Sequence, residues 1–337
     1  MKQSKWTLGI NAILLLIFAG CSADEPLEKV QTDGRVEIRV SSGISSSVEP
    51  LSRAVLDGMI NSAFTSDLDV AFARTDATDA AATTYGTYET NALVGSVNGS
   101  TKELSFSPAA YYLANGYKTK LVGWYPRRSG ITFDATAGTV AFGDIDGKTD
   151  IMVTTLKVGD KNTKIASFGF SHLLTQICVK AYAVDADTKT LWGAVNTVKI
   201  TGKKQPCTLN LPVVSSADDS KVTPVFGTST GDLTLVPQQP DDNAAITWPI
   251  DLGVGTGNAV TTGYAMFAPV AAGGSIELQI DLADGGLQKK SILAPGTDGF
   301  KPGFSYEITL KFTSAGITPT VSIVNWETGD PITDVEI

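Results

Sequence analysis

The chain has very few of the residues that most enzymes and metal sites depend on. It contains one histidine, His172, in 337 residues, and three cysteines, none of them in a C-x-x-C pair. A Ser-His-Asp triad, imidazole acid–base chemistry and His-containing zinc sites are therefore weak hypotheses. The cysteine spacing gives no support to a thiolate metal site either. We expect no cofactor, no metal and no catalytic residue.

Basic residues are also in deficit. Lys and Arg number 26 against 35 Asp and Glu, which gives a net charge of −9 and a pI near 4.7. Because a broad grip on phosphates needs clustered cations, we expect no nucleic-acid partner. Charged residues make up only 18% of the chain and hydrophobic residues 42%, so it can fill real cores and is not a disordered polymer. The length suggests about two domains.

The strongly apolar run at residues 8–18 lies near the N-terminus. Lys2 and Lys5 precede it, and Ala19, Gly20 and Cys21 follow it. A run of this length is too short to span a bilayer, and small residues before a cysteine are typical of a lipoprotein signal. The sequence predicts a signal peptide at 1–20 and a lipidated Cys21 that anchors the mature chain in the outer membrane. An ordinary cleaved signal or a short buried helix is the alternative.

Cys178 and Cys207 are the two remaining thiols. An exported compartment permits them to form a disulfide. The alternative is that each is separately buried as a small hydrophobic residue. The sequence leaves both interpretations open.

Beyond residue 30 the chain shows short alternating runs bounded by Gly, Asp, Asn, Ser and Pro, which is typical of sheets with one buried face. The runs are at residues 36–40, 67–72, 102–106, 131–133, 177–182, 198–200, 208–211, 275–282 and 306–312. Helical spacing is nearly absent, the best stretch being residues 54–60. The fold class is therefore all-β.

Turn residues near Val158, Gly159 and Asp160 offer the best domain boundary. We expect one β-sandwich over 54–160 and a second over 161–337, after a propeptide at 21–53. The polar stretches at 77–84 and 238–243 favour exposed loops.

Several strings, taken in order, resemble the fimbrillin family with Mfa-like domains, the type V pilins of anaerobic gut and oral bacteria. They are Ala19-Gly20-Cys21, Ser52-Arg53-Ala54, Gly123-Trp124-Tyr125-Pro126, Asp150-Ile151-Met152-Val153, Phe168-x-Phe170-x-His172-Leu173-Leu174, Phe300-Lys301-Pro302-Gly303-Phe304-x-Tyr306-x-Ile308-x-Leu310 and Trp326-Glu327-x-Gly329. They extend over nearly the whole mature chain.

The resemblance implies two tandem transthyretin-like sandwiches and a protein that polymerises instead of catalysing. In that family an N-terminal strand completes the first sheet until a trypsin-like, Arg-specific protease removes it. The groove then accepts a C-terminal strand from another pilin subunit, so that a surface fimbrium grows by β-strand addition. The implied partners are other subunits, that protease, the outer membrane and a host or bacterial surface ligand.

The cleavage site implied by this scheme is Arg53-Ala54. It follows an alternating strand with Val36, Ile38 and Val40 on one face and a polar, cleavable loop at residues 41–47. Arg74, at the end of the next strand, is the main rival.

The predicted donor strand is the C-terminal segment 332–337. Thr333, Val335 and Ile337 form one face of it, with Ile332 on the other. The alternative is that the end of the chain completes its own second domain as an edge strand, a role that fits residues 321–326 in particular.

The other notable residues favour structural roles. His172 is interpreted as a hydrogen-bonded histidine at a strand start, Trp124 and Tyr125 as the edge of a core, and Arg127 and Arg128 as a solvated pair. Acidic pairs such as Asp144 and Asp146 bind calcium or flank a glycosidic bond in other proteins. The competing functions are thus a surface lipoprotein that binds glycan or host ligand without polymerising, and an exported carbohydrate-active enzyme. Stalk, anchor and tip roles in a fimbrium are not separated by the sequence.

Overall fold

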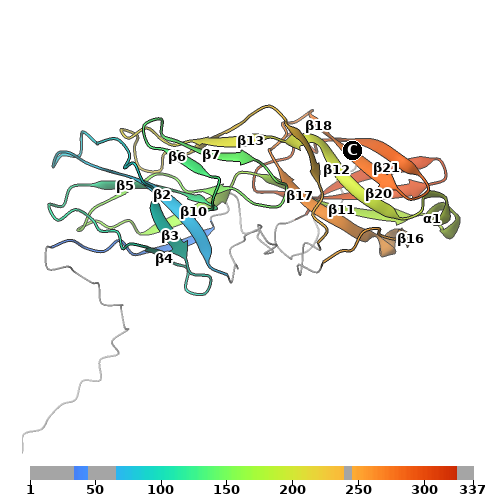
Figure 1. Ribbon diagram of the computed structural model, residues 1–337, viewed down its shortest axis with the longest axis horizontal. Coiled ribbons are helices and arrows are strands. Elements are labelled where there is room, and N and C mark those ends of the chain that lie inside the picture. Colours follow the sequence, from blue (N-terminus) through green and yellow to red (C-terminus); the bar gives the residue numbers. More distant parts are fainter. Residues whose placement is uncertain (1–33, 45–65, 239–244, 325–337) are drawn as a thin grey trace, which may run out of the picture.

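The computed structural model describes residues 34–44, 66–238 and 245–324, and these residues are mostly β-strand. The described part contains one α-helix, α1 (Ala186–Trp192), and one 3-10 turn, η1 (Thr256–Asn258). Within it, no helix has the length and apolar character needed to cross a membrane. The molecule is elongated, with one group of sheets at each end (Figure 1).

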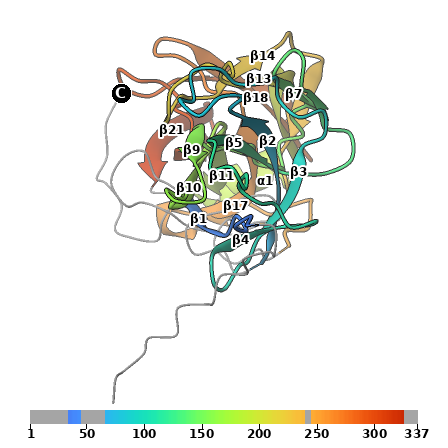
Figure 2. The ribbon, with the colours of Figure 1, turned by 90° about the vertical axis from the view of Figure 1, so that its left-hand side faces the viewer.

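The first group, called here the first unit, contains an eight-stranded sheet in the order β2-β3-β4-β1-β10-β8-β5-β9. Its strands are β1 (Val40–Ile44), β2 (Leu68–Asp76), β3 (Leu93–Val97), β4 (Glu103–Phe106), β5 (Thr119–Tyr125), β8 (Met152–Val153), β9 (Lys157–Gly159) and β10 (Ser167–His172). Because β2 also pairs with β5, seven of these strands form a closed ring. Figure 2 views this unit end-on.

A second layer covers the first unit. It is a four-stranded sheet in the order β14-β13-β7-β6. Its strands are β6 (Thr132–Asp134), β7 (Thr139–Asp144), β13 (Pro206–Asn210) and β14 (Thr223–Phe226). The pairing of β7 with β13 joins segments that are far apart in the sequence.

The second unit consists of two sheets. One has the order β16-β11-β20-β21 with β17 also paired to β11, and the other has the order β15-β12-β18-β19. The strands are β11 (Thr175–Ala183), β12 (Val195–Lys204), β15 (Gly231–Thr234), β16 (Gly253–Val254), β17 (Val260–Phe267), β18 (Ser275–Leu282), β19 (Gly286–Leu293), β20 (Ser305–Thr313) and β21 (Gly316–Val324). On β18 the even-numbered residues Ile276 to Leu282 are buried and their neighbours are not, as expected for a sheet that covers a core on one face.

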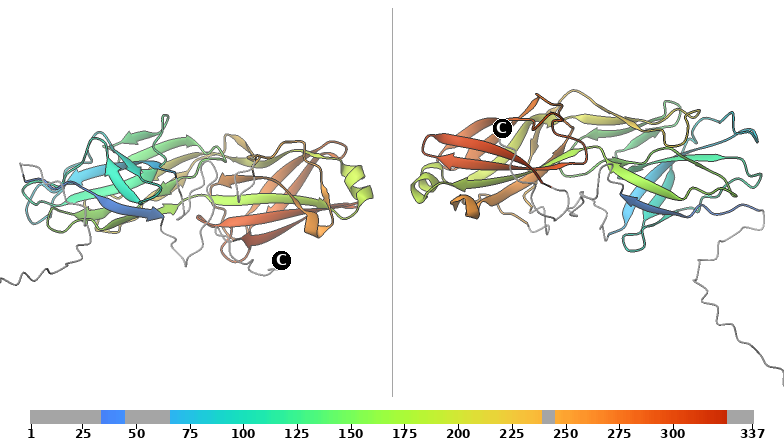
Figure 3. Two further views of the ribbon diagram at one scale, coloured as in Figure 1. Left: turned by 90° about the horizontal axis from the view of Figure 1, so that it is seen from below. Right: turned by 180° about the vertical axis from the view of Figure 1, so that it is seen from behind.

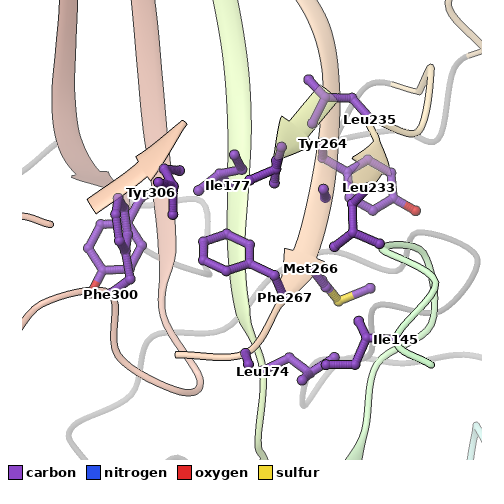
Figure 4. Close-up of a cluster of buried hydrophobic side chains, with 14 of the residues drawn as sticks. Ile145, Leu174, Ile177, Leu233, Leu235, Tyr264, Met266, Phe267, Phe300 and Tyr306 are labelled. Carbon is purple, nitrogen blue, oxygen red and sulfur yellow. The ribbon is translucent and has the colours of Figure 1, made fainter. Parts of the chain in front are cut away.

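The two units share a packed junction. The chain crosses between them after β10, between β12 and β13, and between β14 and β15. Ile145, from the loop after β7, lies beside Leu174 and Met266 of the second unit (Figure 4). The backbone N–H of Met266 donates to the carbonyl of Gly147 at 2.8 Å. Several crossings and a shared apolar cluster favour one continuous rod.

The predicted domain boundary at residue 160 does not match these sheets. β10 belongs to the first sheet, although it follows that boundary. β13 and β14 return to the first unit after β12 has already entered the second. Turn residues mark where a strand ends, but the partner of the next strand is decided by non-local packing.

The strands predicted from alternation are confirmed from β2 onward, and the predicted loop at 77–84 lies outside the named β-strands as expected. The helix α1 was not predicted. Asp185 caps it by accepting a hydrogen bond from the Thr188 N–H at 2.7 Å, and Gly193 ends it at a φ of +67°. The segments 54–60 and 239–243 lie outside the described residues.

Candidate functional site

The position of β1 is the most unusual feature of the first unit. β1 lies between β4, to which it is antiparallel, and β10, to which it is parallel. Ser41 is opposite Glu103 on one side and Ser167 on the other. In the view from below, β1 runs along the near face of the first unit (Figure 3, left). We call the place that β1 occupies between β4 and β10, together with the positions of residues 36–39, the β1 site.

Three alternate side chains of this segment point into the core. Ile38 is 1% exposed, and Val40 and Ser42 are each 3% exposed. Ile38 and Val40 belong to a cluster of buried residues that also contains Phe72, Phe106, Phe168 and Phe170. The Phe72 ring centroid lies 4.8 Å from that of Phe168 and 5.5 Å from that of Phe106. Burial of Ile38 and Val40 stabilises the unit by about 1.5–3 kcal/mol each.

Ser42 provides a polar group on this otherwise apolar face. Its hydroxyl donates to the carbonyl of Phe168 at 3.4 Å. This contact satisfies a buried hydroxyl that would otherwise be costly to bury. The β1 site therefore has two apolar positions followed by one that accommodates a hydroxyl.

The outer face of the segment is charged. Arg39 pairs with Glu37 at 3.2 Å and with Glu103 of β4 at 3.4 Å. The hydrogen bond and charge of Glu37, and the charge of Glu103, raise the pKa of the Arg39 guanidinium. Because the side chains of Arg39 and Glu103 are 44% and 47% exposed, their ion pair contributes little energy but favours the present register.

β1 completes the ring of the first sheet. Taking it away from the pairing order would leave β4 and β10 without a strand between them. Both edges would then expose backbone N–H and C=O groups above the phenylalanine cluster. Removal of β1 would therefore leave a groove between β4 and β10.

The strand itself differs from the predicted one. The sequence predicts a strand at 36–40 and a loop from 41, whereas β1 begins at Val40 and extends to Ile44. Residues 36–38 instead pair with 110–112, where Ile38 N–H donates to the Ala110 carbonyl at 2.8 Å. The predicted alternation of Val36, Ile38 and Val40 is correct, and it continues to the buried Ser42, which is the local signal that the strand extends beyond Val40.

The rival cleavage residue Arg74 lies in the interior of β2. It is opposite Leu121 of β5, and its side chain is 9% exposed. Its guanidinium pairs with Asp76 at 3.0 Å and with Glu89 at 3.2 Å. A protease must bind its substrate as an extended, accessible strand, so Arg74 is protected in the folded unit.

The remaining predicted site residues fall outside the described part of the chain. These are Cys21, Arg53, Ala54, Ile332, Thr333, Val335 and Ile337. The last described strand, β21, pairs only with β20 and ends at Val324, so residues 316–324 lie at the edge of the second unit's own sheet.

Cys178 and Cys207 form no disulfide in the structure and are both buried. Cys178 is on β11 and Cys207 is on β13, which belong to different sheets. Burial raises the pKa of the Cys207 thiol to about 12. The interpretation as two separately buried small residues therefore describes their arrangement here.

The surroundings of His172 and Trp124 are those of residues with a structural role. The ring of His172, at the end of β10, contacts the buried carboxylate of Asp150 through Nδ1. Trp124 is 2% exposed in β5, and its ring centroid lies 5.4 Å from that of Phe133, with the two rings tilted by 39°. Among the described residues, no group of His, Cys, Asp or Glu is arranged to hold a metal ion.

Arg127 and Arg128 follow β5 and each has an acidic partner. Arg127 pairs with Asp69 at 3.0 Å and Arg128 with Asp146 at 3.4 Å. Both side chains are partly exposed, as expected for a solvated pair.

Comparison with known proteins agrees with the fold. The sequence model of the family described as Fimbrillin-like matches residues 53–326. A candidate cell adhesion protein from Bacteroides uniformis is 18% identical, with a TM-score of 0.55, over 88% of this chain and 99% of its own. A second, from Bacteroides ovatus, is 16% identical with a TM-score of 0.50, over 87% and 99%. A fimbrial protein from Bacteroides vulgatus is 14% identical with a TM-score of 0.45, over 87% and 99%. No curated protein matches the chain.

Proposed function

Because the chain belongs to the Fimbrillin-like family, we propose that it is a structural subunit of a surface fimbrium that polymerises by exchange of its first strand. Membership in a family of fimbrial and adhesion proteins implies a cell-surface location. We assign the lipid anchor to Cys21. The protein acts in this proposal as a stalk or anchor subunit and not as an enzyme.

The observation that carries the proposal is the position of β1 as a closing strand of the first sheet. It is held by β4 and β10, which are distant in the sequence, and joins β2 only through residues 45–67. A single cut in that segment would leave β1 bound by non-covalent contacts alone. Its loss would open a groove that an extended strand can fill.

Arg53 is the proposed cleavage residue within that segment. It lies after β1 and before β2, so a cut there separates the strand whole. The paired and buried position of Arg74 supports this choice over the rival. Cleavage at Arg74 would also divide β2, which forms part of the core.

The donor in this proposal is the C-terminal segment at 332–337. It follows β21, which already completes the hairpin with β20. The segment is therefore not needed for that hairpin. Insertion into another subunit is head-to-tail and does not close, so a filament forms.

We further propose that the units are transthyretin-like sandwiches. The two packed sheets of the second unit support this, because their inward residues form one cluster. The first unit departs from a simple sandwich through its additional ring-closing pairing between β2 and β5.

The test is limited trypsin digestion of the folded precursor, followed by N-terminal sequencing and size analysis. We expect a new N-terminus at Ala54, release of the fragment that contains β1, and formation of ladders. Arg53→Ala should prevent all three, while Arg128→Ala serves as the control and should prevent none. A first cut after Arg74 would contradict the cleavage assignment. A stable monomer after loss of β1 would instead favour a surface lipoprotein that binds its ligand without polymerising.

A further inference from the structure

We propose that the buried pair formed by Asp150 and His172 fixes the second unit against the first. The pair lies where the chain first crosses from one unit to the other, between β10 and β11. It acts as a conformational device. While the pair is intact the two units form one rod, and when it is broken the junction loosens although both units stay folded.

Three segments that are far apart in the sequence meet at this pair. They are the loop 145–151 between β7 and β8, the crossing 172–174 between β10 and β11, and the turn 299–304 before β20. A Cβ on Gly303 would lie 3.7 Å from the Cβ of His172, which places the turn of the second unit against the histidine. Three of the motif strings found in the sequence therefore converge here, at residues 150–153, 168–174 and 300–310.

Both members of the pair are buried. The side chain of Asp150 is 0% exposed and that of His172 is 9% exposed. The Asp150 Oδ1 accepts a hydrogen bond from the N–H of Ile151 at 2.8 Å, and its Oδ2 contacts the Nδ1 of His172. A buried carboxylate is costly unless it is paired, so loss of the histidine would force the carboxylate to move toward water.

Backbone hydrogen bonds next to the pair connect the two units. The N–H of Leu173 donates to the Ile151 carbonyl at 2.9 Å, which holds the crossing against the loop. The N–H of Gly303 donates to the Leu174 carbonyl at 2.8 Å, which holds the turn before β20 against the crossing. Both bonds depend on the backbone positions of residues beside Asp150 and His172.

The loop that carries Asp150 also contacts the second unit directly. The N–H of Met266 in β17 donates to the Gly147 carbonyl at 2.8 Å. Ile145, at the start of the loop, lies beside Leu174 and Met266 (Figure 4). Movement of Asp150 would therefore displace a loop that has contacts on both units.

Two further ion pairs on these segments are exposed to solvent. Asp146 pairs with Arg128, and their side chains are 39% and 45% exposed. Asp298 pairs with Lys301, and their side chains are 60% and 37% exposed. Exposed pairs contribute little energy, whereas breaking a buried pair by removing one partner is strongly unfavourable. The junction thus depends on the buried pair, and Asp298 offers a matched control in the same turn.

The experiment compares two single variants with the parent, all as full-length monomers that also carry Cys21→Ser. Asp150→Asn removes the charge and keeps the size of the side chain. His172→Leu leaves the carboxylate without the histidine and should have the larger effect. Asp298→Asn is the control.

The distance between the units is measured by double electron–electron resonance. Spin labels are placed on Ser105→Cys in β4 and Ser291→Cys in β19, because both serines are exposed and lie in different units. The two native cysteines described above are buried, and protein without the introduced cysteines checks that they stay unlabelled. We expect a narrow distance distribution from the parent and from Asp298→Asn, and a broader one from both variants of the pair.

Hydrogen exchange shows where the junction loosens. Protection of the Leu173, Gly303 and Met266 amides should fall about tenfold or more in the variants of the pair, while amides in the middle of β2 and β20 keep theirs. Loss at Leu173 alone would assign the pair to the first unit and overturn the proposal. An unchanged distance distribution would also overturn it, as would equal broadening in Asp298→Asn.

A second variant decides the question if the single variants do not fold. Asp150→Leu/His172→Leu removes both polar groups and leaves no unpaired buried charge. It should fold and still give the broader distribution. A narrow distribution from it, or its failure to fold, would overturn the proposal. Polymerisation is not measured, so the proposed function stands or falls separately.

Discussion

Two strands near the ends of the described chain, β1 and β21, are held in opposite ways. β21 pairs with β20 at nine positions across a tight turn, where the Thr313 hydroxyl donates to the Gly316 carbonyl at 2.9 Å. Among the described strands, β1 pairs only with β4 and β10, whose paired residues are 60 or more positions away in the sequence. A hairpin stays together if the chain is cut elsewhere, whereas a strand held by distant partners becomes a separate peptide once its connection is cut. We therefore expect that the first unit can open at one strand while the second remains closed.

Cutting the chain between β1 and β2 should have the largest effect, because it weakens the hold on β1 and leaves the β20–β21 hairpin unchanged. A covalent connection gives β1 an effective concentration on the order of 1 mM, so a cut at ~1 µM protein weakens its hold by about 4 kcal/mol. We expect trypsin-nicked protein to lose hydrogen-exchange protection in β4 and β10, with β20 and β21 unchanged. The Arg53→Ala precursor, treated in the same way, is the control. Equal loss in both units would contradict the proposed separation.

Truncating a buried side chain of the β1 segment should have the second largest effect on stability. Ile38 is 1% exposed, whereas Ile323 of β21 is 36% exposed. Ile38→Ala should cost about 2–4 kcal/mol in the unfolding free energy of the first unit, and Ile323→Ala only about 1 kcal/mol in the second. Urea unfolding of both variants measures this difference. If Ile323→Ala were the more costly change, the burial argument for the β1 site would be wrong.

The same two regions show what the sequence reveals and what it does not. Alternation of apolar residues identifies β18 to the residue and predicts that Ile38 and Val40 share a buried face. It does so because the side-chain period of a strand is local. The end of β1 at Ile44 was not predicted, because pairing with Phe170 of β10 decides it.

The pairing partners of the strands and the short helix α1 could not be predicted from the sequence for similar reasons. The return of β13 to the first unit depends on β7, and no turn residue encodes that choice. The helix α1 has seven residues, too few for a helical period to be visible, although Asp185 and Gly193 at its ends are ordinary capping signals. The β1 site as a groove could be inferred only by resemblance to a family, since it needs the positions of β4 and β10.

Low pH should change the stability of the first unit more than that of the second, but by a smaller amount than the changes above. In the first unit, burial works against ionisation of Asp160, but hydrogen bonds from the Thr163 and Asn162 N–H groups and the nearby Lys118 outweigh it and lower its pKa. A lowered pKa in the folded state stabilises the fold above the unfolded carboxyl pKa of about 4, and this stabilisation is lost as the pH falls through the folded value.

We therefore expect Asp160→Asn to destabilise the first unit by about 1–2 kcal/mol at pH 7 and to flatten the dependence of its stability on pH below about pH 4. Asp251→Asn, at an exposed aspartate of the second unit, is the control. Unfolding curves at a series of pH values measure both. A variant that keeps the steep acid dependence of the parent would assign it to other carboxylates.

The smallest effect concerns the rim of the β1 site, where the incoming and outgoing strands differ in charge. Glu103 attracts Arg39 of the β1 segment at 3.4 Å. The proposed donor segment instead carries Asp334 and Glu336 on the face opposite Thr333, Val335 and Ile337, so its insertion would bring carboxylates to the rim that contains Glu103. Glu103→Gln should therefore weaken the hold on the β1 segment and favour its replacement. Because the groups are exposed, the change is within about 0.2–1 kcal/mol, or up to about fivefold in extension rate at low salt.

Added salt should raise the extension rate of the parent toward that of the Glu103→Gln variant, because salt screens the repulsion between the carboxylates. Glu277→Gln, at an exposed ion pair of the second unit, should leave both the rate and its salt dependence unchanged. An extension rate that is insensitive to both Glu103→Gln and salt would show that the inserted carboxylates do not lie at this rim.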